Sequence, residues 1–225
     1  FWERLRQQGK PLLKEKPLGR NLEEATSFLK ACKHHHVPLV TAIQRRSHSS
    51  YTILKKELQE QQVLELTATL HLGFDPYQKP ARWRGKAEKA GGGALLDSGY
   101  HMVDLVFFLL SRFCLIDANL WFNGTLGHAG MLETDAKLVG RSGQAWVRIE
   151  SCVGGVQQGG VYQKKEVIMV QTEAAVYEAN RECVKKDGVV IHECSRSWEQ
   201  AMAAQLTQFG EMIQTARFGQ PKVWD

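Results

Sequence analysis

The sequence of 225 residues lacks any apolar run of the roughly 18 residues that a membrane-spanning helix needs. It also lacks internal repeats and low-complexity tracts. Its lysines and arginines are scattered along the chain, so the net charge of +5 does not indicate a nucleic-acid partner. With 43% hydrophobic residues, the chain has ample core-forming material for one large domain or two small ones. We therefore expect a soluble globular protein that binds neither nucleic acid nor membrane.

Paired cysteine spacing of the kind that holds a metal is also missing. The cysteines are odd in number, namely Cys32, Cys114, Cys152, Cys183 and Cys194. Reduced thiols in an intracellular, cytoplasmic protein are the simplest interpretation. Three consecutive histidines at positions 34–36 stand near Cys32, but they cannot all face one ion and no carboxylate completes a ligand set. We expect no metal site.

The third absence is the glycine-rich phosphate loop, because no G-x-G-x-x-G occurs in these residues. A dinucleotide site therefore cannot be derived from such a loop.

The N-terminal segment predicts a strand–helix–strand unit. Residues 10–14 and 37–43 form short strands, and residues 22–35 form a helix. Asn21 caps this helix, with Glu24 completing a capping box. Tight connections of this kind indicate a βαβ unit of a parallel sheet. Because one such unit cannot be a domain, we expect it to be part of something larger.

The rest of the chain predicts an α+β domain. A helix over 50–61 precedes a half-buried strand over 64–72, in which leucine and alanine alternate with polar residues, and 76–89 is a loop. Further strands are expected over 118–122, 134–138, 145–152, 165–171, 175–180 and 189–192, with a final helix over 197–216. These elements predict a mostly antiparallel, open-faced sheet with helices on one face. Few charges are expected on the other face, which favours burial against a second copy in a homo-oligomer, a dimer or tetramer.

One stretch combines an apolar helix with ionisable side chains. Three glycines at 91–93 precede an almost wholly apolar helix that runs to residue 110. Asp97, His101 and Asp104 lie at i, i+4 and i+7, on one stripe of this helix. Buried ionisable groups are costly unless they are paired or used, so the stripe is either a satisfied structural network or a site. The adjacent glycine-rich turn favours a site, in which His101 exchanges protons and Asp97 orients it or holds a substrate hydroxyl.

Two further groups stand at strand ends. Glu15-Lys16-Pro17 follows the first strand, at the edge where open α/β sheets bind ligands. Lys16 could stabilise a developing alkoxide, or it could be an ordinary solvated lysine. Arg45 and Arg46 follow the second strand on the same edge, where they could contact a ligand or be surface charges.

Together these residues resemble the Gfo/Idh/MocA oxidoreductases, the family of glucose–fructose oxidoreductase and inositol 2-dehydrogenase. The resemblance rests on Glu-Lys-Pro-Leu at 15–18, Gln-Arg-Arg at 44–46 with Tyr51, Trp-Arg at 83–84, and the string G-G-G-x-x-x-D-x-G-x-H-x-x-D at 91–104. It covers essentially the whole chain. The family implies a Rossmann domain that binds NAD or NADP, and a C-terminal domain that holds a sugar, polyol or related small molecule.

The resemblance also implies roles for individual residues. Lys16 and His101 would be the catalytic pair, with Asp97 as their partner at the substrate hydroxyl. The cofactor would be contacted by Glu15, Lys16 and Pro17. The substrate would be contacted by Arg45, Asp97, His101, Asp104 and Tyr162.

The fold class that follows is α/β: residues 1–48 as the last βαβ part of a Rossmann domain, then residues 49–225 as an α+β substrate-binding and oligomerisation domain. The family's pyrophosphate loop and closing helix are not found in these residues. Arg45-Arg46-Ser47-His48-Ser49 replaces the usual R-R-[FY]-[DN]-P, and Tyr100 replaces an aliphatic residue before His101. We expect an NAD(P)-dependent oxidoreductase that transfers a hydride to or from a hydroxyl-bearing substrate. The alternative is a non-catalytic relative that acts as a ligand sensor or assembly scaffold.

Overall fold

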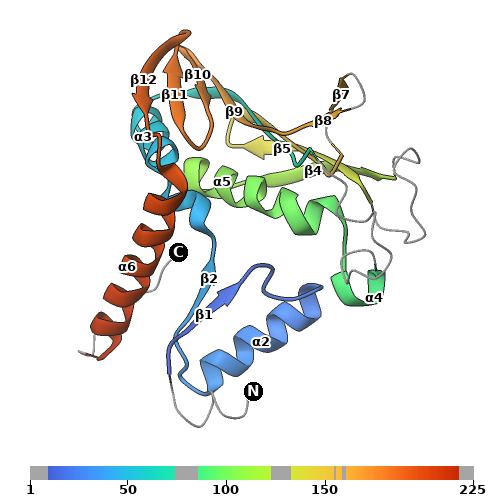
Figure 1. Cartoon of the computed structure of the whole chain (residues 1–225), viewed down its shortest axis with the longest axis vertical. Coiled ribbons are helices and arrows are strands. Elements are labelled where there is room, and N and C mark those ends of the chain that lie inside the picture. The colour runs from blue at the N-terminus through green and yellow to red at the C-terminus, as the bar shows by residue number, and fades with distance from the viewer. Residues whose placement is uncertain (1–9, 74–85, 123–132, 155, 159–160, 218–225) are drawn as a thin grey trace.

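The computed structural model describes residues 10–73, 86–122, 133–154, 156–158 and 161–217. Its N-terminal unit consists of strand β1 (Leu12–Glu15), helix α2 (Leu22–His34) and strand β2 (Leu39–Ala42). The two strands pair in parallel, with Leu12 opposite Leu39. Figure 1 shows this unit apart from the large sheet, below helix α5 (Tyr100–Leu110). The predicted βαβ unit is confirmed.

The start of α2 differs in one detail from the predicted capping box. Asn21 Oδ1 accepts a hydrogen bond from the backbone N–H of Glu24 at 2.8 Å, as a helix cap does. The Glu24 carboxylate accepts instead from the backbone N–H of Arg20 at 2.9 Å, and it also binds the Arg20 guanidinium. One of the two hydrogen bonds of a capping box is therefore present, the one accepted by Asn21. In place of the other, the Glu24 carboxylate binds Arg20, one residue before the cap.

The middle of the chain supplies the helices that cover the large sheet. The elements in order are a 3₁₀ helix η1 (Gln44–Ser47), α3 (Ser49–Leu58), strand β3 (Val63–His71), a short helix α4 (Ala87–Ala90), a π-helical turn η3 (Leu95–Gly99) and α5. The predicted loop over 76–89 was wrong at 87–89, where α4 forms a helical turn, and most of the remainder lies outside the described residues. The central helix is confirmed, although its first turn is a π-helix.

Eight strands form the large sheet, in the order β12-β11-β10-β9-β3-β6-β5-β4. Their bounds are β4 (Cys114–Trp121), β5 (Asp135–Ser142), β6 (Ala145–Cys152), β9 (Lys165–Thr172), β10 (Val176–Ala179), β11 (Cys183–Lys186) and β12 (Val189–Glu193), with β3 as given above. Every neighbouring pair is antiparallel except β3 and β6, which run in parallel. A separate hairpin joins β7 (Val156–Gln158) to β8 (Val161–Gln163), and α6 (Ser197–Arg217) ends the described chain. The mostly antiparallel sheet is confirmed.

Helices α3 and α5 cover one face of this sheet and close the main core (Figure 1). Along β6, buried Val147 and Ile149 alternate with outward-facing residues, as a strand with one covered face requires. Met102 and Leu105 of α5 pack against this face and are fully buried. Each such side chain contributes roughly 1.5–3 kcal/mol by leaving water, so α5 is anchored firmly where it carries its polar stripe.

The uncovered face of the sheet is richer in charge than expected. Ion pairs join Arg148 to Glu65 at 2.5 Å and Lys137 to Glu150 at 3.6 Å on exposed side chains. The expectation of few charges was therefore wrong. These residues come from three different strands, β3, β5 and β6. Cross-strand pairing brings opposite charges together, which the sequence of one strand does not reveal.

One described helical stretch, Ala87–Leu110, is long and apolar enough to cross a membrane by length and composition alone. In its most apolar window 56% is buried inside the molecule. Its C-terminal part contributes four side chains to the main core under the sheet, which is the packing of a core helix: Met102, Leu105, Val106 and Leu109.

Candidate active site

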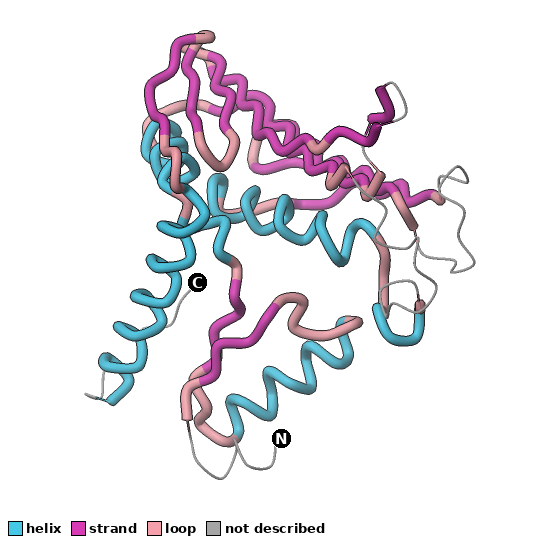
Figure 2. The backbone as a smooth tube through the Cα atoms, viewed as in Figure 1, coloured by secondary structure: helices cyan, strands magenta, loops and turns pink. Residues whose placement is uncertain are grey.

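Lys16 and Asp97 meet although 81 residues separate them in the sequence. Lys16 follows β1 at its carboxyl end, and Asp97 lies in the π-helical turn η3. The ammonium Nζ lies 3.3 Å from Asp97 Oδ1 and also donates to the backbone carbonyl of Asp97. Both side chains are mostly buried, at 17% and 20% exposure. The structure thus brings the end of the parallel unit to the start of α5, as Figure 2 traces.

The glycine-rich turn fixes where this helix begins. The Glu133 carboxylate accepts hydrogen bonds from the backbone N–H groups of Gly93 at 2.8 Å and Leu95 at 3.2 Å. A carboxylate in this position also interacts favourably with the helix dipole. A Cβ on Gly93 would lie 1.9 Å from the Glu133 carbonyl oxygen, so only glycine permits this approach. The turn therefore fixes the position of Asp97 along the helix, beside Lys16.

A π-helical turn over Leu95–Gly99 carries Asp97. Such turns are rare and occur often at functional sites. Asp97 lies within this turn, whereas His101 and Asp104 lie in the α-helix that follows, so the regular i, i+4, i+7 stripe expected from the sequence is locally altered. Lys16 binds inside this turn, to both the carbonyl and the carboxylate of Asp97.

His101 is 7% exposed, and its Nδ1 is buried with no hydrogen-bond partner in the described part of the chain. Its pKa is lowered from 6.5 to about 2, first by burial and then by the positive charges of Arg45, Lys16 and Arg181. The expected partner Asp97 is not among the groups that shift it. The imidazole is therefore neutral near pH 7, the form that can accept a proton.

The carboxylate of Asp104 is held by Arg46. Nε and Nη2 of Arg46 donate to the two oxygens of Asp104 at 2.8 Å and 2.5 Å. The hydrogen-bonded carboxylate raises the pKa of Arg46. This bidentate pair ties η1 to α5, so the predicted substrate contact at Asp104 has its oxygens engaged within the protein.

Arg45, from the same 3₁₀ helix, turns into the sheet. Its Nε and Nη2 donate to Glu166 at 3.1 Å and 3.2 Å, and Arg181 Nε lies 3.1 Å from Glu166 Oε2. The Tyr51 hydroxyl donates to Glu166 Oε1 at 3.0 Å. Sequence reasoning missed Glu166 and Arg181, because neither belongs to a motif and their partners lie far away along the chain.

The remaining predicted residues are placed less fully. Glu15 ends β1, and Pro17 follows Lys16 directly. The backbone of Tyr162 lies in β8, whereas its side chain, like Trp83 and Arg84, lies outside the described residues.

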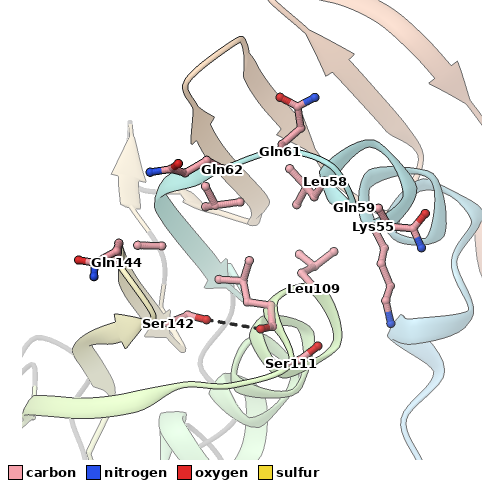
Figure 3. A pocket seen from close by; sticks show the side chains of 12 residues that line it. Lys55, Leu58, Gln59, Gln61, Gln62, Leu109, Ser111, Ser142 and Gln144 are labelled. Carbon is pink, nitrogen blue, oxygen red and sulfur yellow. Dashed lines mark hydrogen bonds between the residues drawn. The ribbon is translucent and has the colours of Figure 1, made fainter.

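A cavity of about 630 Å³ lies at the other end of α5 (Figure 3). Its walls include Leu109 and Leu110 from that helix and Gln61 and Gln62 from the segment before β3. Among the described residues that line it, Lys55 is the only one with a titratable side chain. The Lys16–Asp97–His101 cluster instead combines a neutral imidazole, a carboxylate and an ammonium, so it is the better candidate for acid–base chemistry.

Comparison with known proteins is consistent with this geometry. Residues 62–136 match the family model of the GFO/IDH/MocA C-terminal domain. A levoglucosan dehydrogenase of Pseudarthrobacter phenanthrenivorans is 30% identical over 117 residues, which is 50% of this chain and 30% of that protein. The NADP⁺-dependent scyllo-inositol 2-dehydrogenase of Bacillus subtilis is 28% identical over 116 residues, 51% of this chain and 32% of that protein. These matches therefore span about a third of the length of each relative.

Solved structures share the fold at low identity. A levoglucosan dehydrogenase in complex with NADH and levoglucosan has a TM-score of 0.76 at 17% identity, covering 95% of this chain and 66% of that one. An aldose–aldose oxidoreductase of Caulobacter crescentus, complexed with glycerol, has a TM-score of 0.78 at 19% identity, covering 96% and 65%. The architecture is therefore that of these oxidoreductases.

Proposed function

We infer that this chain is part of a Gfo/Idh/MocA-type protein, because residues 62–136 match that family's C-terminal domain, and we propose that it serves an NAD(P)-dependent oxidoreductase. The proposed reaction moves a hydride between the nicotinamide and a hydroxyl or carbonyl carbon of a sugar, polyol or related small molecule. The contact between Lys16 and Asp97, one helical turn before a neutral His101, is the observation that carries this proposal.

The residues present fit one part of such a cofactor. Glu15, Lys16 and Pro17 stand at the carboxyl end of a parallel strand, where open α/β sheets bind nucleotides. They would hold the nicotinamide end, since these residues contain no phosphate loop. NAD(P), when bound, takes up or supplies the hydride.

The chain's own side chains would handle the proton and the oxygen. His101 is neutral, so it can accept the hydroxyl proton during oxidation and return it during reduction. Lys16 would stabilise negative charge on the substrate oxygen, which acts mainly in the transition state. Asp97 holds the Lys16 ammonium and would contact the same oxygen. We assign Asp104 to positioning α5 through Arg46.

The test is turnover by the full-length protein with the substitution His101→Ala. We expect kcat to fall by about 10²–10⁴-fold with a smaller change in KM, and Lys16→Ala to behave likewise. His71→Ala is a matched control, because this half-buried histidine at the end of β3 has Lys165, Glu150 and Asp135 as its charged neighbours.

A thermal melt beside the kinetics separates catalysis from structure. If His101→Ala melts early but each folded molecule turns over normally, the catalytic assignment is wrong. The sensor or scaffold alternative predicts ligand binding without turnover in the unsubstituted protein.

A further inference from the structure

Glu166 is a buried carboxylate shared by several donors. Its side chain is 5% exposed, and it receives the guanidinium of Arg45, the Nε of Arg181 and the hydroxyl of Tyr51. Burial alone acts to raise its pKa, yet Arg45 and Arg181 more than offset this and the net pKa is lowered. Glu166 is therefore a charged carboxylate whose hydrogen-bonding capacity is largely used.

The cations around it outnumber their counter-charges. Lys164, just before β9, lies near the same group, and its pKa is lowered by burial and by the charges of Arg181 and Arg45. Glu182 acts on Lys164 in the opposite direction. Even with Glu182 counted, three cations face two carboxylates in this part of the described structure. The third cation, Lys164, is exposed to solvent, so it is available to an anionic ligand.

This cluster adjoins the candidate active site. Arg45 and Arg181 both act on His101, together with Lys16. Lys16 has Asp97 as its own partner, so the excess positive charge comes from the side of β9 and of the turn between β10 and β11. Arg45 directly precedes Arg46, which binds Asp104 on the same helix as His101, so hydrogen bonds also place the cluster beside α5.

We propose that Arg181 and Lys164 form an oxyanion subsite, and that the substrate is a sugar or polyol derivative bearing a carboxylate or phosphate. The inference rests on the proposed function and narrows its substrate class. The side chain of Arg181 is 24% exposed, and its Nε lies 3.1 Å from Glu166 Oε2, so its planar guanidinium lies where it can also meet a planar oxyanion from solvent. Arg45 is 9% exposed and donates two hydrogen bonds to Glu166. It therefore adds positive charge to the subsite without contacting the ligand directly.

Calorimetric titration of the full-length protein with inorganic phosphate and with acetate tests the subsite. Both are oxyanions, and the anion that binds with the lower Kd indicates whether the substrate carries a phosphate or a carboxylate. We expect Arg181→Gln to weaken binding by about ten-fold or more, the loss of one charge-assisted contact, and Lys164→Gln to weaken it in the same direction. Lys137→Gln is the matched control, because it removes one positive charge from the open face of the sheet and should leave affinity unchanged.

Arg181→Gln could also destabilise the fold by weakening the compensation of Glu166. Lys164 is exposed and its variant keeps the Glu166 contacts, so it tests the subsite in a folded protein. Binding that is absent, or equal in both variants and the control, overturns the subsite. Because the titration needs no turnover, this failure is distinct from failure of the proposed dehydrogenase activity.

Discussion

Two histidines are buried in the described structure under conditions that keep them neutral. His48 is fully buried, with its ring centroid 6.1 Å from Tyr51 and 6.5 Å from Trp198. Burial is the main reason that its pKa falls to about 4, and that of His101 to about 2. Both side chains therefore bind a proton more readily in the unfolded chain than in the folded one.

This difference predicts acid sensitivity. Between pH 6.5 and 4 the unfolded state binds more protons, so the free energy of unfolding should fall as pH is lowered, by about 1.4 kcal/mol per pH unit for each histidine. His48→Phe removes one of these groups and fills the same aromatic surroundings, so its slope should be shallower by about that amount. Urea unfolding at a series of pH values measures the slopes. Equal slopes in both proteins would contradict the assignment of His48 as a buried neutral group.

Single residues differ in how far the sequence alone could identify them. Lys16, Asp97 and His101 could be selected because each interrupts a recognisable local pattern, a strand end or an apolar helix. Glu166 and Arg181 could not, because Glu166 lies in an ordinary strand and meets Arg45 from 121 residues away. A buried charge cluster is a property of tertiary contacts, and no local spacing encodes it.

At the scale of elements, the turn that starts the active-site helix depends on Gly93. A Cβ there would lie 1.9 Å from a backbone carbonyl, which cannot move aside as a side chain would. We expect Gly93→Ala to lower the free energy of unfolding by about 1–3 kcal/mol, the usual cost of overpacking. Gly210→Ala in α6 is the matched control, since nothing lies within 4 Å of its Cβ position. There alanine should stabilise the helix by up to about 1 kcal/mol.

Thermal melts of the two glycine variants should therefore shift in opposite directions. If both shift alike, the close approach to Glu133 does not determine the turn.

Elements with strong local signals were predicted well, and those with tertiary causes were not. The cap at Asn21 and the alternation in β3 are encoded within a few residues, and both are present. The π-helical turn is not encoded in this way, because its backbone forms hydrogen bonds with Lys16 and Glu133, which lie in distant segments of the chain. The parallel pairing of β3 with β6 also depends on chain topology rather than on either strand's composition.

At the scale of the whole molecule, the large sheet has one face packed on α3 and α5 and one face that none of the described elements covers. The open face combines ion pairs with Trp146, which is 43% exposed and stacked under Arg141 at 4.0 Å. Aromatic and arginine side chains in this arrangement are typical of protein interfaces. The homo-oligomer expected from the sequence remains a prediction. The face on which it rests carries both charged and aromatic side chains rather than apolar ones alone.

We expect light scattering at micromolar concentration to show a dimer or tetramer that forms through this face. Trp146→Glu should weaken it, because the new carboxylate would have to be desolvated at the interface beside Glu65, which lies opposite on β3. Phe107→Glu is the matched control, since Phe107 is 42% exposed on α5, away from the open face. Dissociation by the Trp146 variant alone would support association through the sheet. A monomer in the unsubstituted protein would contradict it, and equal dissociation by both variants would place the contact elsewhere.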